Sequence, residues 1–299
     1  MNRILLALVA AATTAIPAAG PKTSIAHRGA SAYAPEHTRA AYELAIAQGA
    51  DYVEQDLAVT ADGQLVCIHD DSLERTTDVE DVFPDRFTTD ANGTKRWMVA
   101  DFTLAEIKRL DAGRWFDAKF AGERMLTWQE AVKVVNNRAG LYPELKSPAL
   151  YKGRRIDMVA LFAAALRESG LDKASDPVRP RLIVQSFDAD AIKALSSALP
   201  AIPRVLLVGD ARSAARWLSE DGLKEVKAMA TGIGPAKQIL EVRPEIVKAA
   251  HAAGLTVTPY TFRSQNTGRF SDVRAEMDYF LNTLGVDALF TDNPDRFPR

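Results

Sequence analysis

Cysteine is almost absent from this chain, because Cys67 is the single example among 299 residues. One cysteine excludes an internal disulfide and any metal site built from several thiolates. Cys67 lies within the apolar run L-V-C-I, which is typical of a small buried hydrophobic residue. The carboxylate, imidazole and basic side chains are therefore the main candidates for chemistry in this chain.

The chain also lacks a strong net charge and two common hydrolase motifs. Its 37 basic and 39 acidic side chains give a formal net charge of -2, which suggests neither nucleic acid nor an anionic membrane as a partner. An anionic substrate would have to be attracted by a local basic cluster. Neither H-E-x-x-H nor a Ser-His-Asp signature is present. The remaining composition, 47% hydrophobic and 25% charged, is that of an ordinary soluble protein with a large core.

No apolar run is long enough for a comfortable membrane span, but the N-terminus has its own pattern. Arg3 precedes an apolar stretch over 4–12, and P-A-A-G at 17–20 supplies small residues. This order is typical of a secretory signal peptide, with an uncleaved anchor as the alternative. We expect residues 1–20 to direct export to the periplasm or medium. Residues 21–299 would form the mature protein, without stable membrane insertion.

Short β-type runs alternate with helix-type stretches along the mature chain. The expected strands are 24–27, 51–59, 65–69, 140–146, 181–186, 204–208, 226–230, 255–260 and 287–291. The expected helices are 38–48, 128–136, 155–169, 189–199, 213–219, 244–253 and 271–284. This alternation predicts an α/β fold of the (β/α)₈ TIM-barrel type. An open doubly wound sheet is the alternative, although no Gly-rich phosphate loop opens the first helix.

Residues 70–124 interrupt the alternation and are too many for a plain loop. Their one good helical pattern covers 101–110, with Asp101 or Thr103 as the cap and Glu106 positioned for a capping box. We expect an inserted subdomain after the second strand, at the mouth of the barrel. Its aromatic residues are expected to form a small core of their own: Phe83, Phe87, Trp97, Phe102, Trp115, Phe116 and Phe120.

Two pairs of charged residues occupy alternate positions on expected strands. In V-E-Q-D, Glu54 and Asp56 place both carboxylates on one strand face. Such carboxylates repel one another unless a cation or a proton lies between them, and Ca²⁺ or Mg²⁺ suits oxygen ligands. A solvated pair at a strand end is the alternative. In P-E-L-K, Glu144 could complete the carboxylate set, while Lys146 could neutralise a phosphate or simply pair with Glu144.

The chain has four histidines, and two of them end short apolar runs. A (β/α)₈ barrel places its chemistry at the ends of its strands, so His27 and His69 are candidates for proton transfer. Arg28 would place an anion-binding guanidinium beside the first imidazole. His37 is interpreted as a helix cap or a supporting residue, and His251 as structural. A structural role is the alternative for any single histidine.

Several motifs together resemble the glycerophosphodiester phosphodiesterase family. They are H-R-G-A-S-A-Y-A-P-E-H-T, V-E-Q-D-L-A-V-T-A-D-G-Q-L-V-C-I-H-D, L-E-R-T-T-D-V, P-E-L-K, V-Q-S-F-D and G-V-D-A-L-F-T-D-N-P-D-R. The resemblance covers almost all of the mature chain, and F-P-D-R with A-D-F-T-L-A-E-I-K is similar to the exported, periplasmic branch. It implies a (β/α)₈ barrel with a small insertion after the second strand. It also implies hydrolysis of glycerophosphodiesters, such as glycerophosphocholine or glycerophosphoethanolamine, to glycerol 3-phosphate and an alcohol.

The resemblance assigns a metal site and an acid/base pair to residues of this chain. Glu54, Asp56 and Glu144 would bind calcium, with magnesium as the alternative. His27 and His69 would be the catalytic acid/base pair. We expect the first to act as base and the second as acid, with the exchanged roles left open. Whether water or the glycerol 2-hydroxyl attacks first is also open.

The resemblance also identifies residues that would contact or support the substrate. Arg28 and Lys146 would hold the phosphate, and Glu36 would support the site. The chain departs from many members in having His37 after that glutamate, and in having Tyr260 where tryptophan is common. The second departure affects the leaving-group side of the pocket.

Two other functions remain as alternatives. A phospholipase D-type lipid phosphodiesterase resembles this family in fold and metal site, and an exported binding protein could keep the barrel without turnover. The C-terminal T-D-N-P places Thr291 and Asp292 at a strand end, where we interpret them as turn and capping residues. Head-group preference and oligomeric state are not indicated by the sequence.

Overall fold

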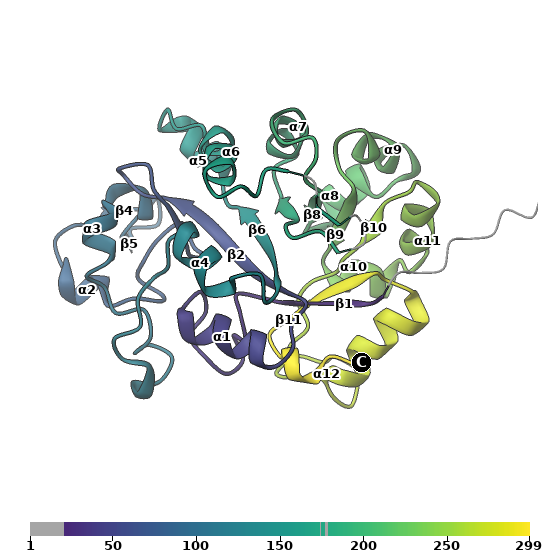
Figure 1. Cartoon of the computed structure of the whole chain (residues 1–299), viewed down its shortest axis with the longest axis horizontal. Helices are drawn as coiled ribbons and strands as arrows, with labels where there is room; N and C mark the ends of the chain where they lie inside the picture. Colours follow the sequence, from purple (N-terminus) through teal and green to yellow (C-terminus); the bar gives the residue numbers. More distant parts are fainter. Residues whose placement is uncertain (1–20, 174, 177–178) are drawn as a thin grey trace, which may run out of the picture.

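The computed structural model describes residues 21–173, 175–176 and 179–299, so the expected signal peptide lies outside the described residues. Within them, eight parallel strands lie side by side in the order β10-β9-β8-β7-β6-β2-β1-β11 (Figure 1). Their bounds are β1 Thr23–Ala26, β2 Tyr52–Val59, β6 Gly140–Leu145, β7 Val184–Ser186, β8 Arg204–Val208, β9 Gly232–Pro235, β10 Thr256–Val257 and β11 Ala288–Thr291. A parallel bridge between Phe262 and Thr291 joins the two ends of this order. The expected (β/α)₈ barrel is therefore confirmed.

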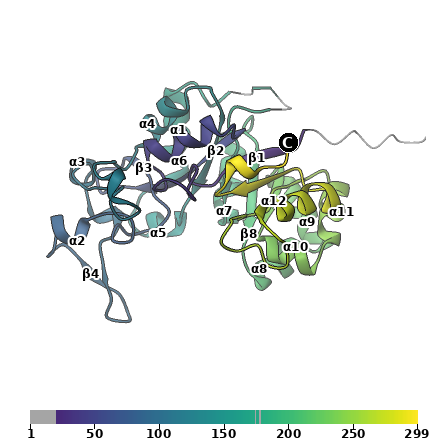
Figure 2. The ribbon, with the colours of Figure 1, turned by 90° about the horizontal axis from the view of Figure 1, so that it is seen from below.

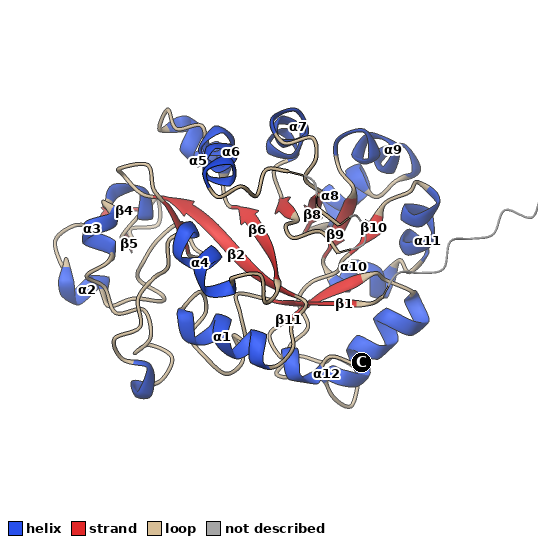
Figure 3. Cartoon of the chain, viewed as in Figure 1, coloured by secondary structure: helices blue, strands red, loops and turns tan. Residues whose placement is uncertain are grey.

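Helices follow the strands and cover the outside of the barrel (Figure 3). They are α1 Arg39–Ala47, α4 Trp128–Val135, α5 Pro148–Gly153, α6 Met158–Glu168, α7 Ala189–Ala198, α8 Ala211–Trp217, α9 Glu220–Met229, α10 Lys237–Val242, α11 Glu245–Ala252 and α12 Val273–Asp278. Side chains cap many of their first turns, as Thr38 does for α1 and Asp188 for α7. No helix of the described residues is long and apolar enough to cross a bilayer.

The expected strand at 226–230 is wrong, because these residues lie at the end of α9. Val226 is buried as part of the helix face, and the strand that follows is β9, with the sequence G-I-G-P. A Cβ on Gly232 would lie 2.2 Å from the Thr256 Oγ1 atom, and one on Gly234 would lie 2.6 Å from the Leu207 Cδ2 atom. Glycine is required there by close packing, and it removes the hydrophobic alternation that identifies a strand.

Alternation along the strands divides the barrel interior into an apolar layer and a polar layer. Ile25, Tyr52, Tyr142 and Phe290 belong to a buried cluster that is separate from the main core. The Tyr52 and Tyr142 rings meet edge to face with centroids 5.8 Å apart. Because side chains two residues apart share a strand face, the next inward positions on β2 and β6 are polar and lie nearer the carboxyl ends. The barrel thus places charged groups directly above an apolar floor.

The segment between β3 and α4 projects from one side of the barrel (Figure 2). β3, Leu65–Cys67, pairs antiparallel with β2 and is not one of the barrel strands. The segment 70–124 contains α2 Val79–Val82, β4 Thr88–Thr89, β5 Lys95–Arg96 and α3 Leu104–Ile107. Thr103 and Glu106 form the expected capping box of α3. Among its aromatic residues Trp97 and Phe102 are buried, whereas Trp115 is 40% exposed.

Candidate active site

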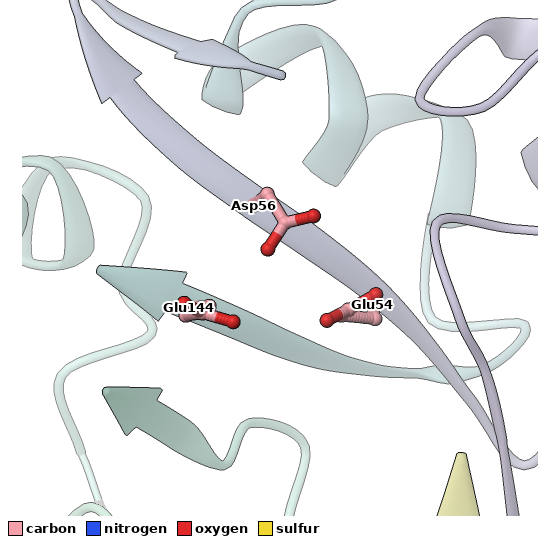
Figure 4. A group of neighbouring side chains, drawn as sticks. All are labelled: Glu54, Asp56 and Glu144. Atoms are coloured by element: carbon pink, nitrogen blue, oxygen red, sulfur yellow. The ribbon is translucent and has the colours of Figure 1, made fainter. Parts of the chain in front are cut away.

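Three carboxylates from two adjacent strands point toward one another (Figure 4). Glu54 and Asp56 come from β2, and Glu144 comes from β6, where it lies directly beside Asp56 in the parallel register. One oxygen of each carboxylate lies within 4.8 Å of the others. All three residues are at most 5% exposed. The strand alternation read from V-E-Q-D thus brings these side chains together as expected.

Burial and mutual repulsion change the acidity of this cluster. Desolvation raises the pKa of Glu54 well above its usual range, and the neighbouring Asp56 raises it further. Desolvation and the same neighbour raise the pKa of Glu144 to about 8. Desolvation also opposes ionisation of Asp56, but the charge of Lys146 and a hydrogen bond with His37 hold its pKa well below the usual value. The cluster therefore carries one stable negative charge and two groups that ionise easily only beside a cation.

These residues fit a divalent cation. The Oδ1 atom of Asp56 is buried and has no hydrogen-bond partner among the described residues. A carboxylate oxygen left in this way, with two further carboxylates beside it, offers the hard oxygen donors that Ca²⁺ and Mg²⁺ prefer. Lys146 partly balances the cluster, with its Nζ atom 3.0 Å from the Glu144 Oε1 atom and 3.9 Å from the Asp56 Oδ1 atom.

A tight turn holds Arg28 against the same carboxylates. Its backbone N–H donates to the Glu54 Oε2 atom at 2.8 Å, and its Nε atom lies 3.4 Å from the Asp56 Oδ2 atom. Arg28 has a φ of 58°, and Gly29 follows with a φ of 87°. A Cβ on Gly29 would lie 2.8 Å from the Ala41 backbone. The glycine of H-R-G is thus required by both conformation and close packing.

His27 follows β1 and is buried beside the carboxylate cluster, with an exposed fraction of 8%. Its Nδ1 atom lies 2.7 Å from the Asp292 Oδ1 atom, and its Nε2 atom lies 3.9 Å from the Glu54 Oε2 atom. Burial lowers the pKa of the imidazole and nearby Arg28 lowers it further, against the opposing effect of Asp292. The sequence predicts a turn and capping role for Asp292. The structure instead places its carboxylate against the imidazole of His27.

His69 follows β3 and is more open, with 35% of its side chain exposed. Its Nδ1 atom lies 2.6 Å from the Asp70 Oδ1 atom. The other oxygen of Asp70 accepts a hydrogen bond from the Arg75 Nε atom at 2.5 Å. Desolvation opposes ionisation of Asp70, but its bonds with His69 and Arg75 hold its pKa below the usual range. The imidazole is therefore fixed through its Nδ1 atom by an ionised carboxylate.

The remaining histidines have different positions. His37 is buried and its Nε2 atom lies 2.9 Å from the Asp56 Oδ2 atom, while its Nδ1 atom lies 2.9 Å from the Tyr42 hydroxyl oxygen. It therefore supports a carboxylate of the cluster, since Thr38 is the residue that caps α1. His251 contacts Asp287 near the outside of the barrel.

One cavity of about 130 Å³ joins most of the predicted site residues. It is lined by His27, Arg28, Glu54, Asp56, His69, Glu144, Lys146, Gln185, Phe187, Leu207, Tyr260, Thr261, Arg263 and Phe290. Glu36 lies behind it, 3.1 Å from an Arg28 guanidinium nitrogen. Larger hollows of about 710 and 690 Å³ surround Asp51 and Arg179 at the amino ends of the strands. We place the candidate site in the smaller cavity, because (β/α)₈ barrels carry their chemistry at the carboxyl ends.

Sequence reasoning missed several residues of the cavity wall. Gln185 donates from its Nε2 atom to the Glu54 Oε1 atom at 3.2 Å. The Phe187 ring meets the Tyr260 ring edge to face with centroids 5.9 Å apart, and Phe187 is 48% exposed. Gln185 and Phe187 belong to the V-Q-S-F-D motif at the end of β7. Their position at the end of an expected strand could have identified them as site residues, because (β/α)₈ barrels carry their chemistry at strand ends.

The chain is similar to proteins of one family across nearly its whole length. Residues 27–296 match the model of the glycerophosphoryl diester phosphodiesterase family. A glycerophosphodiester phosphodiesterase of Bacillus subtilis is 33% identical over 92% of this chain and 84% of that protein. One from Haemophilus influenzae is 31% identical over 92% of this chain and 88% of that protein.

Solved structures give the same result. A glycerophosphodiester phosphodiesterase of Agrobacterium tumefaciens has a TM-score of 0.68 and 30% identity, covering 93% of this chain and 99% of that chain. An Oleispira antarctica phosphodiesterase, solved in complex with the product sn-glycerol-3-phosphate, has a TM-score of 0.70 and 27% identity. That match covers 93% of this chain and 95% of that one.

Proposed function

Because this chain belongs to the glycerophosphoryl diester phosphodiesterase family, we propose that it hydrolyses glycerophosphodiesters to glycerol 3-phosphate and an alcohol. The observation that carries the proposal is the cavity that His27, His69, Arg28 and Lys146 line together with three buried carboxylates. This set supplies the proton transfer and charge stabilisation that cleavage of a phosphodiester needs. Glycerophosphocholine and glycerophosphoethanolamine are the substrates we propose to test first.

We propose that Glu54, Asp56 and Glu144 hold a divalent cation, with Ca²⁺ as our first choice and Mg²⁺ as the alternative. When bound, such an ion supplies Lewis-acid stabilisation of charge on the phosphoryl oxygens. The fit rests on the three converging carboxylates and on the Asp56 Oδ1 atom, which accepts no hydrogen bond from any described residue. His37 and Gln185 each hydrogen-bond one of these carboxylates, which keeps the ligand atoms oriented.

The basic residues would bind the substrate phosphate. Arg28 is fixed through its backbone to Glu54 and through its side chain to Glu36, so its guanidinium would meet the phosphate with little loss of entropy. Lys146 would neutralise a second oxygen and oppose the charge that develops at phosphorus. Tyr260 and Phe187 line the other side of the cavity, where we propose that part of the substrate beyond the phosphate contacts their rings.

The histidines would move the two protons of the reaction. With its Nδ1 atom held by Asp292, His27 has its Nε2 atom near Glu54, and we assign it the proton of the attacking hydroxyl or water. With its Nδ1 atom held by Asp70, His69 would protonate the alcohol oxygen as the phosphorus–oxygen bond breaks. The exchanged assignment fits the same pair of contacts.

Metal-dependent release of glycerol 3-phosphate from glycerophosphocholine tests the proposal. Glu54→Gln should remove nearly all activity, and chelation of the wild type should do the same. Asp51→Asn is the matched control, because Asp51 precedes the same strand at its opposite end and accepts bonds from Ser24. Equal rates for the two variants would contradict the proposed metal site.

The same assay distinguishes the alternative functions. Cleavage of a long-chain lysophospholipid in preference to glycerophosphocholine would indicate a phospholipase D-type lipid phosphodiesterase. Binding of the diesters without turnover would indicate an exported binding protein. Export itself is a separate proposal that rests on the sequence of residues 1–20, and the mass of the mature protein from the periplasm or medium would test it.

A further inference from the structure

The guanidinium of Arg75 lies between two carboxylates at the edge of the candidate site. Its NH2 and NH1 atoms donate to the two oxygens of Glu36 at 2.7 and 3.1 Å. Its Nε and NH2 atoms donate to the two oxygens of Asp70 at 2.5 and 3.3 Å. Arg75 therefore makes a two-point contact with each carboxylate, a geometry that fixes both carboxylates relative to one planar group.

Each of these carboxylates in turn holds a residue that lines the cavity. The Asp70 Oδ1 atom lies 2.6 Å from the His69 Nδ1 atom. Glu36 accepts a hydrogen bond from the Arg28 guanidinium at 3.1 Å. We infer that Arg75 is a positioning residue, which sets the His69 imidazole and the Arg28 guanidinium at a fixed separation. This inference rests on the proposed function, because it gives Arg75 a role in the same reaction.

Arg75 belongs to residues 70–124, the inserted segment, and other residues of that segment hold it in place. The neighbouring Glu74 accepts from the Ser72 hydroxyl at 2.8 Å and from the Trp97 backbone N–H at 3.2 Å. Leu73 is fully buried, and its backbone N–H donates to the Trp97 carbonyl at 2.9 Å. The inserted segment thus anchors the turn from which Arg75 reaches back to the barrel.

A role in stability alone would predict a different result, because it would leave kcat of the folded protein unchanged. The Arg75 side chain is 41% exposed, but its Glu36 partner is only 11% exposed and, despite that burial, owes its low pKa largely to Arg75. The loss of Arg75 should therefore lower the unfolding temperature modestly and leave the protein folded at the assay temperature. It should also release Asp70 and Glu36, so that His69 and Arg28 sample orientations in which they do not act together.

The first experiment compares Arg75→Gln with Arg86→Gln in the full-length protein. Arg86 is a matched control, because it belongs to the same segment, is 43% exposed and contacts the Glu106 carboxylate and the Asp101 carbonyl. For glycerophosphocholine, R75Q should lower kcat about 10- to 100-fold, while R86Q should leave kcat and KM near wild type. Similar kcat values for both variants, beside an active wild type, would overturn the inference.

Two further arms separate positioning from charge and from folding. Arg75→Lys should behave like R75Q, because one ammonium group cannot hold both carboxylates in a planar two-point geometry. In a His69→Ala background, R75Q should cost much less than in the wild type, because one of the two residues it positions is gone. A fully active R75K, or strictly additive losses, would contradict the positioning role. An inactive wild type would instead contradict the proposed function.

Discussion

The two candidate catalytic histidines have the same kind of support in very different surroundings. His27 has its Nδ1 atom against Asp292, whose other oxygen lies 3.3 Å from the Arg263 Nε atom. His69 has its Nδ1 atom against Asp70, which Arg75 contacts in the same way. Yet only 10% of the His27 side chain is exposed, against 35% for His69.

The difference shows how two parts of the chain share one site. His27 and Asp292 lie 265 residues apart and meet because β1 and β11 pair in the barrel. His69 and Asp70 are adjacent in sequence, and their support comes from the start of the inserted segment. The orientation of His27 therefore depends on closure of the barrel, whereas that of His69 depends on local contacts.

The largest effect should come from removing each imidazole in turn. His27→Ala and His69→Ala should each lower kcat for glycerophosphocholine by about 10²- to 10⁴-fold, the usual contribution of a positioned acid or base. Added imidazole should restore part of the activity of H69A, because that position is open to solvent. It should restore H27A much less, because only 10% of the His27 side chain is exposed. Initial rates with and without imidazole test the contrast.

A substrate with a p-nitrophenyl leaving group makes this comparison sharper. Such a leaving group departs without a proton, so the variant that lacks the general acid should recover most with this substrate. We expect that variant to be H69A. Greater recovery by H27A would exchange the two roles, and equal rescue of both variants by imidazole would contradict the difference in burial.

A smaller effect should follow from changing the supporting carboxylates. Asp292→Asn should lower kcat by about 100-fold, because an amide cannot hold the buried His27 in the same protonation and orientation. Asp70→Asn should cost about 10-fold, because the exposed His69 can be solvated and Arg75 stays bound to Glu36. Steady-state kinetics of both variants provide the test. A larger loss for D70N than for D292N would contradict the prediction that His27 depends more on its supporting carboxylate than His69 does.

The sequence predicted the part of this site that strand alternation controls. Glu54 and Asp56 are two residues apart on one strand, and the motif order placed Glu144, His27 and His69 at strand ends. Those positions follow from local periodicity, and the structure joins them in one cavity.

The contacts that depend on barrel closure were not predictable in this way. Asp292 follows an apolar strand in a Thr-Asp-Asn-Pro turn, so its local sequence indicates only a turn. Its contact with His27 requires the pairing of the first and last strands. Strand β9 was missed for a related reason, since its glycines are required by Leu207 and Thr256 on neighbouring parts of the barrel.

Two carboxylates of the site, Glu144 and Glu36, should also respond in opposite ways to pH when metal is removed. In the barrel, the pKa of Glu144 is raised from 4.5 to about 8, so the folded state binds a proton that the unfolded state has lost. Its contribution to stability is complete below pH 4.5 and is lost as the pH rises to about 8. In the turn between β1 and α1, the pKa of Glu36 is lowered from 4.5 to about 2, against the effect of its burial, chiefly by Arg75 and Arg28. That contribution is present above pH 4.5 and is lost as the pH falls toward 2.

In a chelator, the unfolding temperature should therefore be highest at a pH between these two limits. Excess Ca²⁺ should raise the unfolding temperature by roughly 5 °C near pH 8, as expected for an ion present at about 100 times its dissociation constant. The increase should be smaller at pH 5, where protons compete for Glu144. Glu144→Gln should remove much of the alkaline slope and of the response to Ca²⁺. Glu36→Gln should flatten the acid slope, because it removes a contribution that is present above pH 4.5 and already lost near pH 2. A response to Ca²⁺ that is equal in wild type and E144Q would contradict the proposed site, because it would show that the Glu144 carboxylate is not a ligand of the ion.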